Sequence, residues 1–248
     1  MRKLKDKVCI ITGATSGMGK AIAKSFYEQG AKLVLSGRNK ERGVSLASEL
    51  GDSVFVAGDV SESGYNEKLV KSAIEHFGKL DIVSLNAGTL GLGNVVELSI
   101  DDWHKTLDTN LSAIFFMSKY AMPHLEKSNG TLLINASIAA YKSFPNHPAY
   151  CASKAGAVAL MKQLAVEYAP KIRVNAICPG PVDTPFIWDS AKAFENPETA
   201  VADAGKATLL KRLGTPEDVT KLALFLVSDD ASWITGTAMT IDGGILNA

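Results

Sequence analysis

The sequence of 248 residues predicts an α/β fold in which helices cover both faces of one parallel sheet. Short apolar runs rich in β-branched residues alternate with helical patterns along the whole chain, as parallel strands joined by crossover helices require. A glycine-rich turn connects the first apolar run to the first helix. No linker, repeat or low-complexity tract interrupts the alternation, so we expect residues 1–248 to form a single domain.

The first half of the chain contributes four expected strands and three expected helices. The strands are expected at residues 8–11, 32–36, 54–57 and 80–85, and the helices between them at residues 20–29, 41–50 and 67–77. Gly30 follows the first helix as a C-terminal cap. Because parallel strands end at one edge of a sheet, the polar residues that follow these strands should gather there.

The second half begins with a single long helix expected over residues 101–125, with the polar Asn110 in its interior. A second long helix is expected at residues 149–168, and strands at residues 131–136, 173–178 and 238–241. Thr215 should cap a helix over residues 217–227, with Pro216 at its first position. The pattern weakens at residues 185–208, which predicts either a lid over a site or a packed surface excursion.

Composition excludes several classes of partner. Lys and Arg total 26, as do Asp and Glu, and no basic tract is present, so neither nucleic acid nor a membrane surface is expected as a partner. No apolar run reaches the roughly 20 residues that span a bilayer, and the N-terminus lacks signal-peptide character. The three cysteines are widely spaced, which indicates reduced thiols and a cytoplasmic location. We assign no metal site.

The turn at residues 12–19 has the spacing Gly13-x-x-x-Gly17-x-Gly19 between a strand and a helix. Such a turn lets the backbone approach a pyrophosphate, which the helix N-terminus also attracts. An ordinary tight turn is the alternative. The turn residues expected at a dinucleotide are Gly13, Thr15, Ser16, Gly17, Met18 and Gly19.

The residues at the end of the second expected strand indicate whether the dinucleotide is NAD(H) or NADP(H). An acid there would bind the ribose 2′-hydroxyl of NAD, but this chain has Gly37 followed by Arg38, whose guanidinium suits a 2′-phosphate. The sequence therefore favours NADP(H) over NAD(H). Two alternatives remain, because Arg38 could instead stack on adenine and serve NAD(H), or be a solvated charge at the start of the next helix. The other strand-end residues expected near the nucleotide are Asp59, Val60, Asn86, Ala87, Gly88, Pro179, Gly180, Val182 and Thr184.

Tyr150 and Lys154 are four residues apart in an expected helix, so their side chains share one face. An ammonium beside a phenol lowers the phenol pKa from its reference value of about 10, which lets tyrosine act as a general acid or base. Ser137 follows a buried strand and could hydrogen-bond the same substrate oxygen. The alternative is that Tyr150 and Lys154 form an ordinary pair on the surface of a helix. For Asn110, the alternative is a core asparagine whose hydrogen bonds are satisfied within the fold.

Taken in order, these motifs resemble the short-chain dehydrogenase/reductase family along essentially the whole chain. The resemblance implies a Rossmann-type doubly wound sheet and a catalytic tetrad of Asn110, Ser137, Tyr150 and Lys154. It implies that Tyr150 exchanges a proton with the carbonyl or alcohol oxygen and that Ser137 positions this oxygen. Lys154 would lower the Tyr150 pKa and bind the nicotinamide ribose, and Asn110 would hold a water that links Lys154 to solvent.

The resemblance also implies NAD(P)(H)-dependent hydride transfer with a small ketone or secondary alcohol. The chain is similar to 3-oxoacyl-[acyl-carrier-protein] reductases, which gives the alternative function, but the expected approach region at residues 126–129 is mixed in charge. Apolar residues on more than one face of the two long helices, together with the family's habit of pairing them, predict a homotetramer or a dimer.

Overall fold

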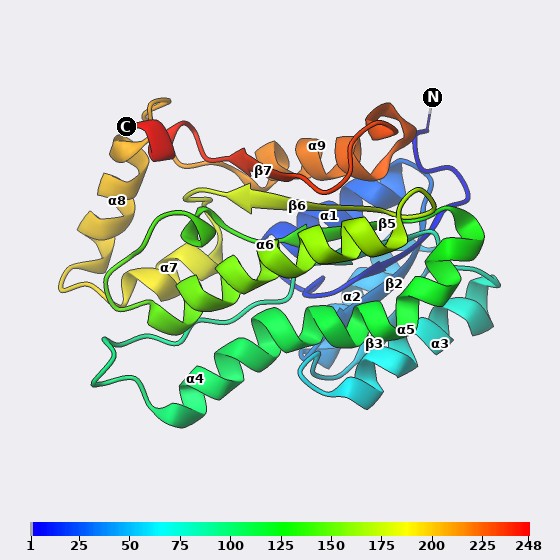
Figure 1. Cartoon of the computed structure of the whole chain (residues 1–248), viewed down its shortest axis with the longest axis horizontal. Helices are drawn as coiled ribbons and strands as arrows, with labels where there is room; N and C mark the ends of the chain where they lie inside the picture. Colours follow the sequence, from blue (N-terminus) through cyan, green and yellow to red (C-terminus); the bar gives the residue numbers. More distant parts are fainter. Residues whose placement is uncertain (1) are drawn as a thin grey trace.

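The computed structural model describes residues 2–248 and contains one seven-stranded sheet in the order β3-β2-β1-β4-β5-β6-β7. Every neighbouring pair of strands is parallel, which confirms the expected fold class. Figure 1 shows β6 and β7 pointing toward the same end of the molecule. The strands are β1 (Val8–Ile11), β2 (Lys32–Gly37), β3 (Ser53–Ala57), β4 (Ile82–Leu85), β5 (Thr131–Asn135), β6 (Arg173–Pro179) and β7 (Ala238–Ile241).

Helices cover both faces of this sheet, because successive strand side chains point in opposite directions. Cys9 and Ile11 of β1 pack with α1 (Gly17–Glu28), α2 (Lys40–Leu50) and α9 (Pro216–Val227). Val8 and Ile10 pack with the other three long helices. These are α3 (Ser63–Phe77), α5 (Ala113–Ser128) and α6 (Pro148–Tyr168), of which α5 and α6 run across the front in Figure 1.

The single helix expected over residues 101–125 is interrupted. It consists of α4 (Ile100–Leu107), a π-helical turn η1 (Asp108–Ser112), and α5. Asn110 lies in that turn with its side chain buried and fully engaged: Oδ1 accepts from the Thr89 amide at 2.8 Å, and Nδ2 donates to the Thr89 carbonyl and the Ser153 hydroxyl. The wider turn is consistent with π-bulges found at functional sites, and a helical periodicity of 3.6 residues cannot reveal it.

The helices elsewhere differ from expectation mainly at their starts. α1 begins at Gly17 and α3 at Ser63, earlier than the apolar periodicity indicated, because polar first turns carry no periodic signal. Thr215 and Asp218 form a reciprocal capping box at α9, as the sequence predicted for Thr215. No helix within residues 2–248 combines the length and apolar character needed to cross a bilayer.

The segment 185–208 contains two helices, α7 (Pro185–Ala191) and α8 (Pro197–Ala207), each with proline at its first position. The Asn196 side chain caps α8 by accepting from the Thr199 amide at 3.1 Å. Figure 1 shows both helices beyond the end of the sheet toward which β6 and β7 point. This segment, called the lid from here on, is the one for which the sequence left open a lid over a site or a packed surface excursion.

Asp81 connects β1 and β4 at the amino end of the sheet. It lies just before β4, and its side chain is almost fully buried. Its Oδ2 accepts from the Val8 amide of β1 at 2.8 Å and lies 3.0 Å from the Lys79 ammonium. The Lys7 ammonium lies 3.7 Å from Oδ1. The Asp81 carboxylate is therefore the side-chain acceptor for the Val8 amide of β1.

We predict that Asp81→Ala lowers the free energy of unfolding by about 1–3 kcal/mol, because the buried Val8 amide loses its acceptor. Asp81→Asn retains an acceptor and should lose less. Asp189→Ala is the matched control, since it removes an exposed i,i+3 ion pair and should change stability by less than about 1 kcal/mol. Denaturant unfolding measures all three, and equal losses in Asp81→Ala and Asp189→Ala would contradict the role given to Asp81.

Candidate active site

Two cavities adjoin at the carboxyl edge of the sheet. The first has a volume of about 400 Å³ and is lined by the glycine turn and the ends of β2, β3 and β4. The second has a volume of about 460 Å³ and lies under α7 and α8. Met18, Tyr150, Thr184 and Phe186 border both, so Tyr150 stands where the two cavities meet.

The glycine turn packs so tightly that side chains cannot replace its glycines. Gly13 has a φ of 63°, and a Cβ there would lie 2.9 Å from the Ala87 backbone nitrogen. A Cβ at Gly19 would lie 2.3 Å from the Gly13 carbonyl oxygen. The buried Thr12 hydroxyl accepts from the amides of Asn86 and Ala87, which ties the end of β1 to the end of β4. The turn is thus fixed against the wall of the first cavity.

The donors and acceptors around the first cavity fit a dinucleotide. Ser16, the N-cap of α1, makes no side-chain capping bond, so the first amides of α1 are not satisfied by that cap. Among the described residues, the buried Oδ1 atoms of Asn86 and Asn135 have no hydrogen-bond partner. The free amides at the start of α1 suit an anionic group such as a pyrophosphate, and the two unpaired amide oxygens suit a ligand that also carries hydrogen-bond donors.

Most residues expected at a dinucleotide do line the first cavity. They are Gly13, Thr15, Ser16, Gly17, Met18, Gly19, Arg38, Asp59, Val60, Asn86, Ala87, Gly88, Tyr150, Lys154 and Thr184. Pro179, Gly180 and Val182 instead line the second cavity, so the structure does not bring them to the first. The reason is their place at and after the end of β6, which β4 and β5 separate from β1 and the glycine turn.

The rim beyond β2 carries two guanidinium groups, Arg38 and Arg42. Arg38 is exposed and precedes α2, and Asn39 caps that helix by accepting from the Arg42 amide at 2.8 Å. Within the part of the chain that the structure describes, neither guanidinium forms an ion pair. We did not expect Arg42 from the sequence, although its place in the first turn after Arg38 was a usable signal.

Lys154 lies beneath Tyr150, as their spacing on α6 predicted. The buried Lys154 ammonium lies 5.6 Å from the centroid of the Tyr150 ring and donates to the Asn135 carbonyl at 2.8 Å. Ser137 follows β5, and its hydroxyl accepts from the Ala139 amide at 3.0 Å. The structure therefore brings Ser137, Tyr150 and Lys154 together.

The expected direction of the Tyr150 pKa is wrong for the free protein. Burial raises the pKa of Tyr150 to about 12, and a side-chain hydrogen bond with Ser137 only partly opposes this. Burial also lowers the pKa of Lys154 to about 8. The low-dielectric surroundings disfavour both charged forms and outweigh the effect that the neighbouring ammonium was expected to have.

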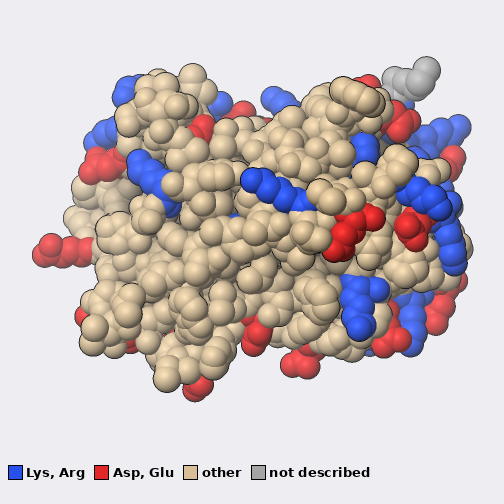
Figure 2. All heavy atoms as spheres, viewed as in Figure 1, with Lys and Arg blue, Asp and Glu red and all other residues tan. Residues whose placement is uncertain are grey.

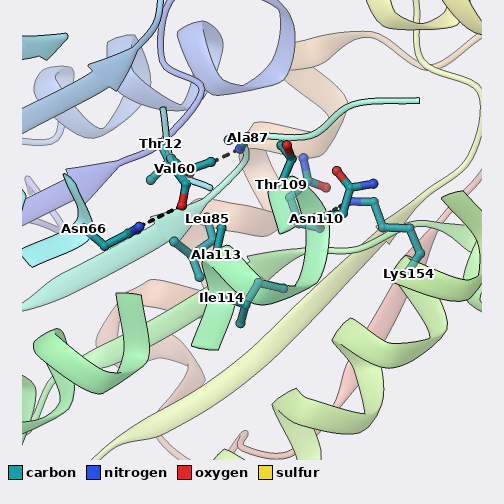
Figure 3. A pocket seen from close by; sticks show the side chains of 11 residues that line it. Thr12, Val60, Asn66, Leu85, Ala87, Thr109, Asn110, Ala113, Ile114 and Lys154 are labelled. Carbon is teal, nitrogen blue, oxygen red and sulfur yellow. Dashed lines mark hydrogen bonds between the residues drawn. The ribbon is translucent and has the colours of Figure 1, made fainter. Parts of the chain in front are cut away.

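Asn110 and Lys154 lie side by side at a third, very small cavity (Figure 3), which shares Ala87, Asn135 and Lys154 with the first. Its volume is about 10 Å³, and its polar lining includes Thr12, Asn66 and Asn135. This is about the space that one water molecule needs. Asn110 therefore fixes the backbone at Thr89 and the hydroxyl of Ser153, and it also faces a polar cavity of single-water size.

The second cavity is lined largely by apolar side chains from α7, α8 and the segment before α6. His147, which precedes α6, packs edge-on against the Tyr150 ring at 6.4 Å between centroids. Its Nε2 lies 2.8 Å from the Ser190 hydroxyl of α7. His147 was not expected from the sequence, because a single histidine before a helix gives no pattern.

Three comparisons with known proteins agree with this geometry. The family model described as enoyl-(acyl carrier protein) reductase, which belongs to the short-chain dehydrogenase/reductases, matches residues 13–246. An uncharacterized oxidoreductase of Thermotoga maritima is 38% identical over 97% of both chains. A 3beta-hydroxysteroid dehydrogenase of Mediterraneibacter gnavus is 35% identical over 98% of this chain and 96% of its own.

Among solved structures, levodione reductase superposes with a TM-score of 0.94 at 31% identity, covering 99% of each chain. The single domain described here, with its Rossmann-type sheet, belongs to the short-chain dehydrogenase/reductase family of oxidoreductases.

Proposed function

We propose that the protein transfers hydride between a nicotinamide cofactor and a ketone or secondary alcohol, with Tyr150 as the general acid and base. The observation that supports this most strongly is the position of Tyr150 at the junction of the two cavities, beside Ser137 and above Lys154. A dinucleotide in the first cavity and a substrate in the second would meet at this phenol. The family implies such a cofactor.

In the reducing direction, the protonated Tyr150 donates its proton to the substrate oxygen. With a pKa of about 12 in the free protein, the phenol holds that proton at neutral pH. The Ser137 hydroxyl donates a hydrogen bond to the same oxygen and fixes its position. A bound nicotinamide supplies the hydride. In the oxidising direction, the phenolate form would accept the alcohol proton; in the free protein, burial outweighs the nearby ammonium and disfavours that form.

Lys154 and Asn110 complete the proposed site. Lys154 holds its charge against the Asn135 carbonyl and binds the nicotinamide ribose. The cavity of about 10 Å³ beside Asn110 accommodates one water, which would link Lys154 toward solvent. Asp59, Val60, Asn86, Ala87 and Gly88 form the proposed walls of the adenine and ribose sites.

We predict that Tyr150→Phe lowers kcat by about 10²–10⁴-fold, the usual contribution of general acid–base catalysis. The ring and its packing on His147 remain, so the dissociation constant for the reduced nucleotide should change little. Nucleotide fluorescence gives the binding, and loss of the reduced-nicotinamide absorbance with a panel of ketones gives the turnover. A variant that retains more than a few per cent of the wild-type kcat would rule out the role given to Tyr150.

We propose that NADP(H) is preferred over NAD(H). Gly37 places no carboxylate where the 2′-phosphate would lie, and the unpaired guanidinium groups of Arg38 and Arg42 flank that rim. Hydrogen bonds to charged groups contribute about 1.5–3 kcal/mol, which corresponds to about 10- to 150-fold in affinity. An Arg38 side chain that stacks on adenine instead would leave the two nucleotides equivalent.

The ratio of kcat/KM for NADPH to that for NADH should therefore exceed about tenfold in the wild type and invert in Gly37→Asp. A Cβ at Gly37 would lie 2.8 Å from Thr15 Cγ2, so Gly37→Ser is the control that introduces the same crowding without a charge. A wild type that favours NADH would contradict the preference. Equal ratios in the Asp and Ser variants would show that charge at this strand end is not the selector.

Reduction of 3-oxoacyl-[acyl-carrier-protein] remains the alternative function. The description of the matched family model names a carrier-protein substrate for that family. A carrier-protein substrate requires a basic landing surface, and residues 126–129 are mixed in charge. A ketone panel that includes a 3-oxoacyl thioester distinguishes the two functions, and it separates both from a nucleotide-binding protein without turnover.

We also propose that the protein is a homotetramer or a dimer, located in the cytoplasm. Phe115 of α5 is 54% exposed and Val166 of α6 is 80% exposed, on helices whose other faces pack on the sheet. Figure 2 shows few charged side chains from the lower left to the centre of the face on which these helices lie. A second copy would cover this apolar surface.

Light scattering at micromolar concentration should therefore give a mass of two or four chains. Phe115→Asp and Val166→Asp should lower that mass, because each places a charge in the contact. Val44→Asp is the control, since Val44 is about as exposed as Phe115 but lies on α2 at the opposite face of the sheet. A wild-type monomer would exclude the proposed assembly.

A further inference from the structure

The two hydroxyls placed to bind a substrate oxygen lie at one end of the second cavity. Ser137 and Tyr150 present hydroxyls beside the junction with the first cavity. Farther under the lid, the wall is formed mainly by aliphatic and aromatic side chains, and the one carboxylate among the lining residues, Asp203, is exposed and paired with Lys206. The apolar side chains include Ile138, Phe144, Phe186, Ile187, Phe194 and Val201.

The polar side chains deeper in the cavity are engaged with each other. The Pro145 carbonyl can only accept, so His147 Nδ1, at 2.6 Å, carries the ring proton. His147 Nε2 is then an acceptor, and the Ser190 hydroxyl donates to it at 2.8 Å. The proton of Ser190 is thereby committed, and the imidazole presents its carbon edge between Phe194 and Tyr150.

The same contacts hold the lid in place over the cavity. The His147–Ser190 bond joins the start of α6 to α7, and Asn146 Nδ2 donates to the Ala193 carbonyl at 3.0 Å just after α7. The apolar wall is therefore a fixed surface of the fold. Its volume of about 460 Å³ lies within the range of sites that enclose a drug-sized molecule.

The lid is unfavourable for anions. Residues 185–208 carry four carboxylates, Asp189, Glu195, Glu198 and Asp203, against only Lys192 and Lys206. Both lysines are paired with lid carboxylates, Lys192 with Asp189 and Lys206 with Asp203. An anionic substrate, or an acidic carrier protein bringing one, finds no unpaired cation on this segment.

We propose that the substrate is an uncharged, bulky apolar alcohol or ketone of fused-ring size, with its reacting oxygen at one end. This inference rests on the proposed hydride-transfer function and specifies its substrate class. The oxygen lies between Ser137 and Tyr150, and the hydrocarbon body fills the space under α7 and α8. An apolar pocket gains affinity with each buried methylene group and rejects a carboxylate that it cannot pair.

The test compares three secondary alcohols on saturated rings: cyclohexanol, decahydro-2-naphthol and 4-hydroxycyclohexane-1-carboxylate. We expect kcat/KM for decahydro-2-naphthol to exceed that for cyclohexanol by at least about tenfold, and that for the carboxylate to be lower by at least about tenfold. Equal values for the two uncharged alcohols, or a preference for the carboxylate, would overturn the proposed substrate class while leaving hydride transfer intact.

A binding measurement separates failure of the substrate class from failure of the proposed function. Calorimetry with decahydro-2-naphthol should give saturable binding whether or not turnover occurs, and none with the carboxylate. Ala204→Trp fills the cavity and should weaken this binding at least about tenfold. Ala202→Trp places the same ring on the exposed side of α8 and should leave it unchanged. Equal effects of the two substitutions on binding, or no binding to the wild type, would overturn the proposed substrate class. Binding without turnover would overturn only the proposed hydride transfer.

Discussion

The buried Lys154 ammonium is the constraint on which the rest of the site depends. Removing a charge from water costs several kcal/mol, so the surroundings must supply partners for it. The Asn135 carbonyl accepts from it at 2.8 Å, and the Tyr150 ring lies above it. The pKa of about 8 shows that these partners offset the cost of burial only in part. A bound ribose would provide further acceptors, so the ammonium favours occupation of the first cavity.

The parallel sheet brings these partners together from distant parts of the chain. β1, β4 and β5 are neighbours, so the glycine turn, Asn86 and Asn135 lie at adjacent strand ends. α6 crosses beside them and carries Tyr150 and Lys154 one turn apart. The π-helical turn then fixes Asn110 against Ser153, which lies between those two residues in the sequence. The close packing of Gly13 on Ala87 leaves this edge little freedom to rearrange.

Much of this arrangement could be predicted because its signals are local. Strand–helix alternation and strand-end residues predicted the sheet, and the four-residue spacing predicted the shared face of Tyr150 and Lys154. The π-helical turn could not be predicted, because it arises from contacts of Asn110 with residues far along the chain. The Tyr150 pKa could not be predicted either, since it depends on how much solvent the fold excludes. The placement of Pro179, Gly180 and Val182 in the second cavity depends on where the lid lies.

The central claim is that a charged Lys154 beneath Tyr150 sustains turnover. The pH dependence of kcat/KM for the reduced nucleotide, at saturating ketone, tests it most directly, because this parameter reports groups that titrate in the free protein. Burial lowers the pKa of Lys154 to about 8, so its ammonium is present below that pH and is lost as the pH rises through it. Tyr150, with its pKa raised to about 12, keeps its proton throughout this window. We therefore expect kcat/KM to be level near neutrality and to fall as the pH rises through about 8. A profile that stays level to about pH 10, near the ordinary lysine pKa, would contradict the account.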